Sequence, residues 1–155
     1  MVATSQPVNN KRLSTMSKIQ LFHFTSLQQL PAILKRGISK GYVDVSPFGG
    51  FSAPCLTATK LKSEQGWVDA SQKDKLQVRI SVEIDENDPM LNRWSDIMIK
   101  HKAPKPWIEF SKSVGWYDSE SWFVYMGVIS SAMFTEVQID NIKNDCILSF
   151  ISKMK

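Results

Sequence analysis

A strand followed at once by a helix, within residues 19–37, is the sequence feature that most limits how this chain can fold. Ile19 to Phe24 is apolar on both faces apart from Gln20 and the ring of His23, which predicts a strand in a central position of a sheet. A helix then runs to Gly37, a residue suited to the left-handed conformation that ends many helices. This strand must therefore pair on both sides, and the helix must pack on the sheet.

The start of this helix carries a capping pattern. Ser26 followed three residues later by Gln29 matches a capping box, which predicts that Ser26 caps the helix. Pro31 then lies one position beyond the first turn, so we expect one lost backbone hydrogen bond and a bend. The residues of the apolar helix face are Leu27, Leu30, Ile33 and Leu34.

Strands dominate the rest of the pattern. Residues 76–84 alternate strictly between apolar and polar side chains, which predicts a half-buried strand whose polar face is wet or lines a cleft. Shorter strands are predicted at 55–59, 121–128, 133–139 and 146–151, the last of which fits a C-terminal helix equally well. Helices are predicted at 91–101 and 107–115. Two helices in the middle, with strands before and after them, indicate an α+β domain.

Length and composition favour one folded domain. The chain has 155 residues, of which 43% are hydrophobic and 22% charged, as in ordinary globular proteins. We expect residues 17–155 to form this domain and residues 1–16, which are polar and resemble no secretory signal, to form a flexible tail. No apolar run is long enough to cross a membrane, so we expect a cytoplasmic protein with no membrane partner. The net charge of +4 favours anionic partners weakly.

Several kinds of chemistry find no support in the sequence. His23 and His101 are far apart and no Cys or His pair has ligand spacing, so no metal is expected. Neither of the two common glycine-rich phosphate-binding motifs, G-x-x-x-x-G-K-[ST] and G-x-G-x-x-G, occurs in the sequence. The sequence places no candidate general base beside Cys55 or Cys146, so we expect both to be reduced thiols in the core. His101 lies at the end of a predicted helix beside two lysines, which favours a structural role.

His23 is a stronger candidate for function. It lies near the end of the first strand, just before a helix N-terminus, whose dipole favours negative charge. A polar ring in that position could contact a phosphate-bearing ligand. Taken alone, these features favour a core or capping histidine over a ligand contact.

The stretch from His23 to Gly37 resembles the opening motif of the ADP-ribosyltransferase-like superfamily, H-[YF]-T-S-x-x-x-L-x-x-I-L-x-x-G. It is similar to the start of DNA-targeting ADP-ribosyltransferase toxins and, more distantly, of RNA 2′-phosphotransferases. The resemblance implies a split, mostly antiparallel sheet with short helices around a cleft that binds NAD. Its diphtheria-toxin-like branch carries a histidine on the first strand, aromatic residues that flank the nicotinamide, and a glutamate on a late strand.

The resemblance implies roles for particular residues. His23 would hydrogen-bond the ribose or amide of the nicotinamide nucleotide, with Thr25 completing an H-x-T arrangement. The segment "LTAT" resembles the second-strand segment of the family, so Thr57 and Thr59 would line the cleft. The late strand "MFTEVQI" makes Glu136 the candidate catalytic glutamate. The competing residues for the aromatic position are Tyr42, Phe48, Phe51 and Tyr125, of which Phe51 and Tyr125 are our candidates for the pocket.

The implied activity is cleavage of NAD at the nicotinamide–ribose bond and transfer of ADP-ribose to a protein or nucleic acid. Breaking this bond generates positive charge on the ribose, which a fixed carboxylate such as Glu136 stabilises. Two alternatives stay open. One is a nucleotide-binding or regulatory protein of the same fold without catalysis. The other is RNA 2′-phosphate transfer, which needs convergent basic residues, for which Arg36, Arg79 and Arg93 are the candidates.

Overall fold

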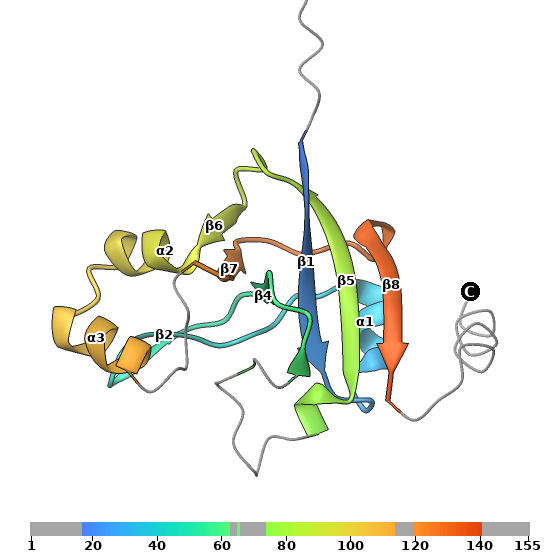
Figure 1. Ribbon diagram of the computed structural model, residues 1–155, viewed down its shortest axis with the longest axis horizontal. Coiled ribbons are helices and arrows are strands. Elements are labelled where there is room, and N and C mark those ends of the chain that lie inside the picture. The colour runs from blue at the N-terminus through green and yellow to red at the C-terminus, as the bar shows by residue number, and fades with distance from the viewer. Residues whose placement is uncertain (1–16, 63–64, 66–73, 114–119, 141–155) are drawn as a thin grey trace, which may run out of the picture.

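The structure is a computed structural model that describes residues 17–62, 65, 74–113 and 120–140 (Figure 1). Within these ranges the chain forms a six-stranded sheet, a two-stranded hairpin and three short α-helices. Every strand pairing between the named strands is antiparallel. The prediction of an α+β fold with a mostly antiparallel sheet is therefore confirmed, while its membership of the ADP-ribosyltransferase-like superfamily stays a prediction.

The large sheet has the strand order β6-β7-β4-β1-β5-β8. Its strands are β1 (Lys18–Thr25), β4 (Cys55–Thr57), β5 (Val78–Asp85), β6 (Leu91–Arg93), β7 (Trp122–Tyr125) and β8 (Phe134–Ile139). The hairpin consists of β2 (Val43–Ser46) and β3 (Gly49–Phe51), and the helices are α1 (Leu30–Arg36), α2 (Trp94–Lys100) and α3 (Lys105–Ser113). The predicted interior position of the first strand is confirmed, because β1 lies between β4 and β5.

Strands β1 and β5 form the centre of the sheet and pair along their whole length, from Lys18 opposite Asp85 to Thr25 opposite Val78. The alternating side chains of β5 pack inward, and Val78, Ile80 and Val82 have no exposed surface. Helix α1 packs through Leu30 on the face of the sheet that carries these three buried residues. It lies behind β5 and β8 in Figure 1. These residues form the first hydrophobic core, which fixes the face of β1 that carries His23.

A second core joins α2 to the hairpin and the other end of the sheet. Trp94, Ile97 and Met98 of α2 are buried together with Val43 of β2 and Val124 of β7. Helices α2 and α3 lie beyond β6, away from β1 and β5 (Figure 1). The hairpin is therefore held against the sheet by a core that is separate from the first one.

The predicted start of the first helix was wrong. Residues 26–29 form a turn in which the Gln29 N–H donates to the Ser26 carbonyl (3.1 Å), and α1 begins at Leu30 with no side-chain cap. Pro31 consequently lies in the first helical turn, where its missing N–H leaves no bond unmade, so the expected bend was also wrong. The predicted end of the helix is confirmed, because the Gly37 N–H donates to the Ile33 carbonyl and φ is 81°. The ψ of −179° is extended, however, and not the left-handed helical value that we expected.

The predicted helix over 91–101 begins three residues later than expected. Leu91 to Arg93 form β6 because they pair with Phe123 to Tyr125 of β7, a long-range contact that local periodicity does not reveal. The predicted helix over 107–115 corresponds to α3, which begins two residues earlier at Lys105, has Pro106 in its first turn and is described as far as Ser113. Residues 91–93, predicted as the first turn of a helix, are therefore a strand because they pair with β7.

Three predictions fall outside the described residues, namely the tail over 1–16, the strand or helix over 146–151, and the reduced, buried state of Cys146. None of the described helices is long and apolar enough to span a membrane.

Candidate functional site

A cavity of about 1170 Å³ opens beside the C-terminal half of β1. Its walls come from β1, helix α1, the segment 37–42 that follows this helix, strand β4 and residues 74–75. The volume exceeds the roughly 300–1,000 Å³ of pockets for drug-sized ligands, which leaves room for a dinucleotide. Three of the predicted site residues, His23, Thr25 and Thr57, line this cavity together.

His23 is fixed in one tautomer. Its Nδ1 lies 3.0 Å from the Cys55 carbonyl oxygen, and because a carbonyl only accepts, Nδ1 carries the proton. In the neutral ring Nε2 is then an acceptor. Burial lowers the pKa of His23 below its ordinary value, and the hydrogen bond to Cys55 offsets this effect in part. The side chain is thus a neutral, oriented hydrogen-bond acceptor in the wall of the cavity.

This lowered pKa predicts a pH dependence of stability. The unfolded chain takes up a proton at His23 near pH 6.5, whereas the folded chain does so only at lower pH. The free energy of unfolding should therefore fall as the pH drops below 6.5, by at most about 1.4 kcal/mol per pH unit, and this term should vanish above 6.5. Urea unfolding at several pH values measures it, and His23→Asn should remove the difference. An unchanged slope in this variant would contradict the assignment.

The two predicted threonines are buried in the cavity wall. Thr25 is 7% exposed and ends β1, whereas Thr57 is 2% exposed and ends β4. The Thr57 hydroxyl accepts the Thr59 N–H (3.1 Å), which fixes its orientation. Thr59, in contrast, does not line the cavity.

The aromatic residues of the cavity differ from the two predicted ones. Phe51 stacks on His101, with ring centroids 4.7 Å apart, and packs against the second core. Tyr125 belongs to the first core and donates to the Asp88 carboxylate (2.8 Å). Burial and this hydrogen bond raise the pKa of Tyr125 to about 12. The aromatic residues that do line the cavity are Phe22, Phe24, Tyr42 and Trp122.

The structure does not bring Glu136 to His23. Residues directly opposite in neighbouring antiparallel strands share a face of the sheet. His23 lies opposite Ile80, and Ile80 lies opposite Val137, so Val137 shares the face of His23. Glu136 is the residue just before Val137 in β8, so it points to the other face, where it is exposed. Its carboxylate lies 3.8 Å from the Arg79 guanidinium.

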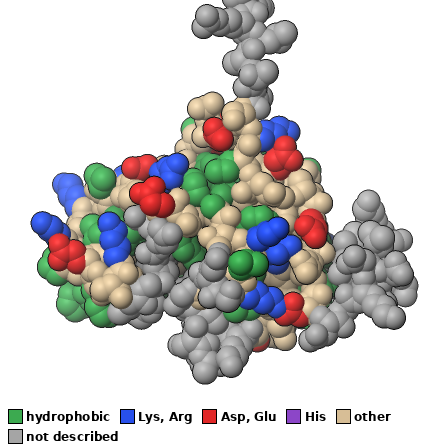
Figure 2. All heavy atoms as spheres, viewed as in Figure 1, with side chains coloured by type: hydrophobic (Ala, Val, Ile, Leu, Met, Phe, Trp, Pro, Cys, Tyr) green, Lys and Arg blue, Asp and Glu red, His purple; other side chains and the backbone are tan. Residues whose placement is uncertain are grey.

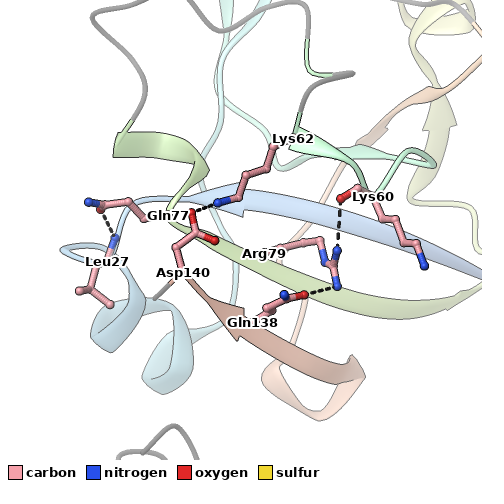
Figure 3. A network of polar contacts seen from close by, with 7 residues as sticks. All are labelled: Leu27, Lys60, Lys62, Gln77, Arg79, Gln138 and Asp140. Carbon is pink, nitrogen blue, oxygen red and sulfur yellow. Dashed lines mark hydrogen bonds and ion pairs between the residues drawn. The ribbon is translucent and has the colours of Figure 1, made fainter. Parts of the chain in front are cut away.

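Arg79 ties the surroundings of Glu136 into a polar network (Figure 3). Its guanidinium donates to the Lys60 carbonyl and to the Gln138 side chain, while Lys62 forms an ion pair with Asp140. Figure 2 shows this face of the molecule, on which basic and acidic side chains lie next to one another. The network joins the segment after β4 to β5 and β8, which is a structural explanation for a glutamate in this position.

The charged side chains of the cavity include more cations than anions. The cations are Arg36, Lys40 and Lys75, and the carboxylates are Asp44 and Asp74. All five side chains are at least partly exposed, so a bound anion can reach the three cations. Because the side chains come from α1, the segment after α1 and residues 74–75, sequence spacing does not reveal this cluster.

The pair of Tyr42 and Asp44 is the feature that sequence reasoning missed. The charge of the nearby Asp44 carboxylate is the main cause that raises the pKa of Tyr42 above its ordinary value. The signal available in the sequence was the loop from Tyr42 to Pro54, in which glycine and proline alternate with aromatic residues. Such a loop indicates a ligand contact, but not which carboxylate makes it.

Comparison of the chain with protein-family models, with curated proteins and with solved structures finds no match. Among the described residues, no group of three His, Cys, Asp or Glu side chains could hold a metal ion. The chemistry of the site therefore has to be argued from the cavity itself.

Proposed function

We propose that this chain binds NAD in the cavity beside β1, cleaves its nicotinamide–ribose bond and transfers ADP-ribose to an acceptor. The observation that carries the proposal is the neutral, oriented imidazole of His23 in a cavity that also holds cationic side chains. The resemblance of residues 23–37 to the start of ADP-ribosyltransferase-like proteins selects NAD among the possible nucleotides.

The cavity supplies the groups that a dinucleotide needs. Arg36, Lys40 and Lys75 offer positive charge for the diphosphate, and hydrogen bonds to charged groups are among the stronger ones in proteins. Tyr42 and Trp122 offer aromatic faces for a ring of the ligand. These contacts would hold the ribose at a fixed place relative to His23, which is the positioning that group transfer requires.

A second candidate is a nucleotide-binding or regulatory protein without catalysis. The observation that favours it is the separation of His23 and Glu136 on opposite faces of the sheet. RNA 2′-phosphate transfer has less support, because the three candidate arginines do not converge. Arg36 lines the cavity, Arg79 lies on the other face of the sheet, and Arg93 ends β6 with its guanidinium over the Phe123 ring.

Two measurements on the full chain test the proposal. Calorimetric titration with NAD should give saturable binding that weakens as the salt concentration rises, because phosphate contacts are electrostatic. Incubation with NAD should release free nicotinamide, which chromatography detects. Binding without release, with any added protein or nucleic acid, would favour the regulatory candidate. Absence of saturable binding to NAD would overturn both candidates.

A further inference from the structure

Two carboxylates line the cavity, and they lie in different kinds of structure. Asp74 is exposed and begins the short 3₁₀ turn over residues 74–76, and its carbonyl accepts the Gln77 N–H. Asp44 is half-buried and belongs to strand β2 of the hairpin. A carboxylate in a rigid element keeps its position relative to a bound ligand, so Asp44 is the better placed of the two.

The backbone of Asp44 is fixed from two sides. It pairs with Gly50 of β3 at a point where the strands lie so close that a Cβ on Gly50 would meet the Val43 carbonyl oxygen at 1.7 Å. On the other side, the indole N–H of Trp107 in α3 donates to the Asp44 carbonyl (3.4 Å). The Tyr42 phenol lies close enough that the charge of the Asp44 carboxylate raises its pKa. The backbone of Asp44 is thus positioned before any ligand binds.

A short chain of contacts connects Asp44 to His23 through Cys55. The Cys55 carbonyl accepts the Nδ1 proton of His23, and the Cys55 thiol lies 3.7 Å from the Tyr42 carbonyl, to which it donates. Asp44 is two residues beyond Tyr42, about 7 Å along an extended strand. The thiol itself is unreactive, because burial raises the pKa of Cys55 to about 12. His23 and Asp44 thus both line one cavity and are connected through Cys55 and the Tyr42 backbone.

We propose that Asp44, and not Glu136, is the catalytic carboxylate that works with His23; this inference rests on the proposed function. The C1′–N bond of the nicotinamide riboside breaks, and its electron pair stays on the nicotinamide nitrogen. The Asp44 carboxylate stabilises the positive charge that remains on the ribose. An acceptor hydroxyl then bonds to C1′ and its proton passes to Asp44 and on to solvent. With water as acceptor, the products are ADP-ribose, nicotinamide and one proton.

The test is Asp44→Asn, measured by the rate of nicotinamide release and by the dissociation constant for NAD. The substitution keeps the backbone bonds to Gly50 and Trp107 and removes only the charge. We expect the rate to fall about a hundredfold or more, while the dissociation constant stays within about threefold. Asp44→Glu returns the carboxylate and should recover part of the rate. Glu83→Gln, on the far side of the sheet at the Lys18 ion pair, should match the wild type.

Three rival carboxylates are tested in the same assay. Asp74 lines the cavity, Glu120 lies two residues before the cavity residue Trp122, and Glu136 is the glutamate that the sequence resemblance selects. A large loss of rate in Asp74→Asn, Glu120→Gln or Glu136→Gln, together with a normal rate in Asp44→Asn, would overturn the inference and leave the proposed function intact. A wild type that neither binds nor cleaves NAD would overturn the proposed function itself. Circular dichroism establishes that each variant is folded.

Discussion

Replacing Gly37 with alanine should destabilise the protein by about 3 kcal/mol or more. Gly37 has a φ of 81° and a ψ of −179°, a region of backbone space that is essentially restricted to glycine. An added Cβ would also lie 2.4 Å from the carbonyl oxygen of Ile129. This oxygen accepts the N–H of Ile38 (2.9 Å), and both isoleucines are fully buried, so the backbone cannot move away without breaking the first core.

Urea unfolding followed by tryptophan fluorescence measures this loss. Gly127→Ala is the matched control, because a Cβ at Gly127 would meet only side-chain atoms at 3.4 Å or more. We expect this control to change the free energy of unfolding by less than about 1 kcal/mol. Equal effects of the two substitutions would contradict the strain argument. Because Gly37 and Ile38 also line the cavity, Gly37→Ala should weaken NAD binding as well.

The sequence was sufficient to predict the central elements of the fold. The alternation over 76–84 predicted β5, and the apolar run over 19–24 predicted β1, because a buried sheet imposes these patterns directly on the chain. The pattern of Ser26 and Gln29 led to a wrong helix start, since these two residues instead close a turn in which the Gln29 N–H donates to the Ser26 carbonyl. Local patterns identify elements well but do not separate a helix start from the turn before it.

The position of Glu136 could not be derived from local sequence. Its face depends on the register between β5 and β8, in which Val137 and not Glu136 lies opposite Ile80. A shift by one residue would exchange the two faces, and the chain contains no local signal for this choice. The placement of Asp44 depends on a different long-range contact, because the hairpin of β2 and β3 is held by a core that α2 provides. Candidate residues can thus be named from the sequence, whereas their grouping into one site requires the pairing of distant strands.

Two substitutions of His23 should separate its contact with a ligand from its contact with the protein. The side-chain amide nitrogen of asparagine occupies nearly the place of Nδ1, so His23→Asn can still donate to the Cys55 carbonyl but lacks the acceptor at Nε2. The glutamine side chain is one carbon longer and reaches toward the Nε2 position, so His23→Gln loses the bond to Cys55. Each variant therefore retains one half of the imidazole's hydrogen bonding.

If His23 holds the nucleotide, as we propose, His23→Asn should keep the unfolding free energy measured at pH 7.5 within about 1 kcal/mol of the wild type. Its dissociation constant for NAD should rise by about tenfold to a hundredfold, which corresponds to the loss of one hydrogen bond in a buried site. His23→Gln should lose stability and bind NAD better than His23→Asn does. Calorimetric titration and urea unfolding of both variants measure the two effects. If His23→Asn bound NAD as tightly as the wild type, His23 would be a structural residue whose only partner is the Cys55 carbonyl.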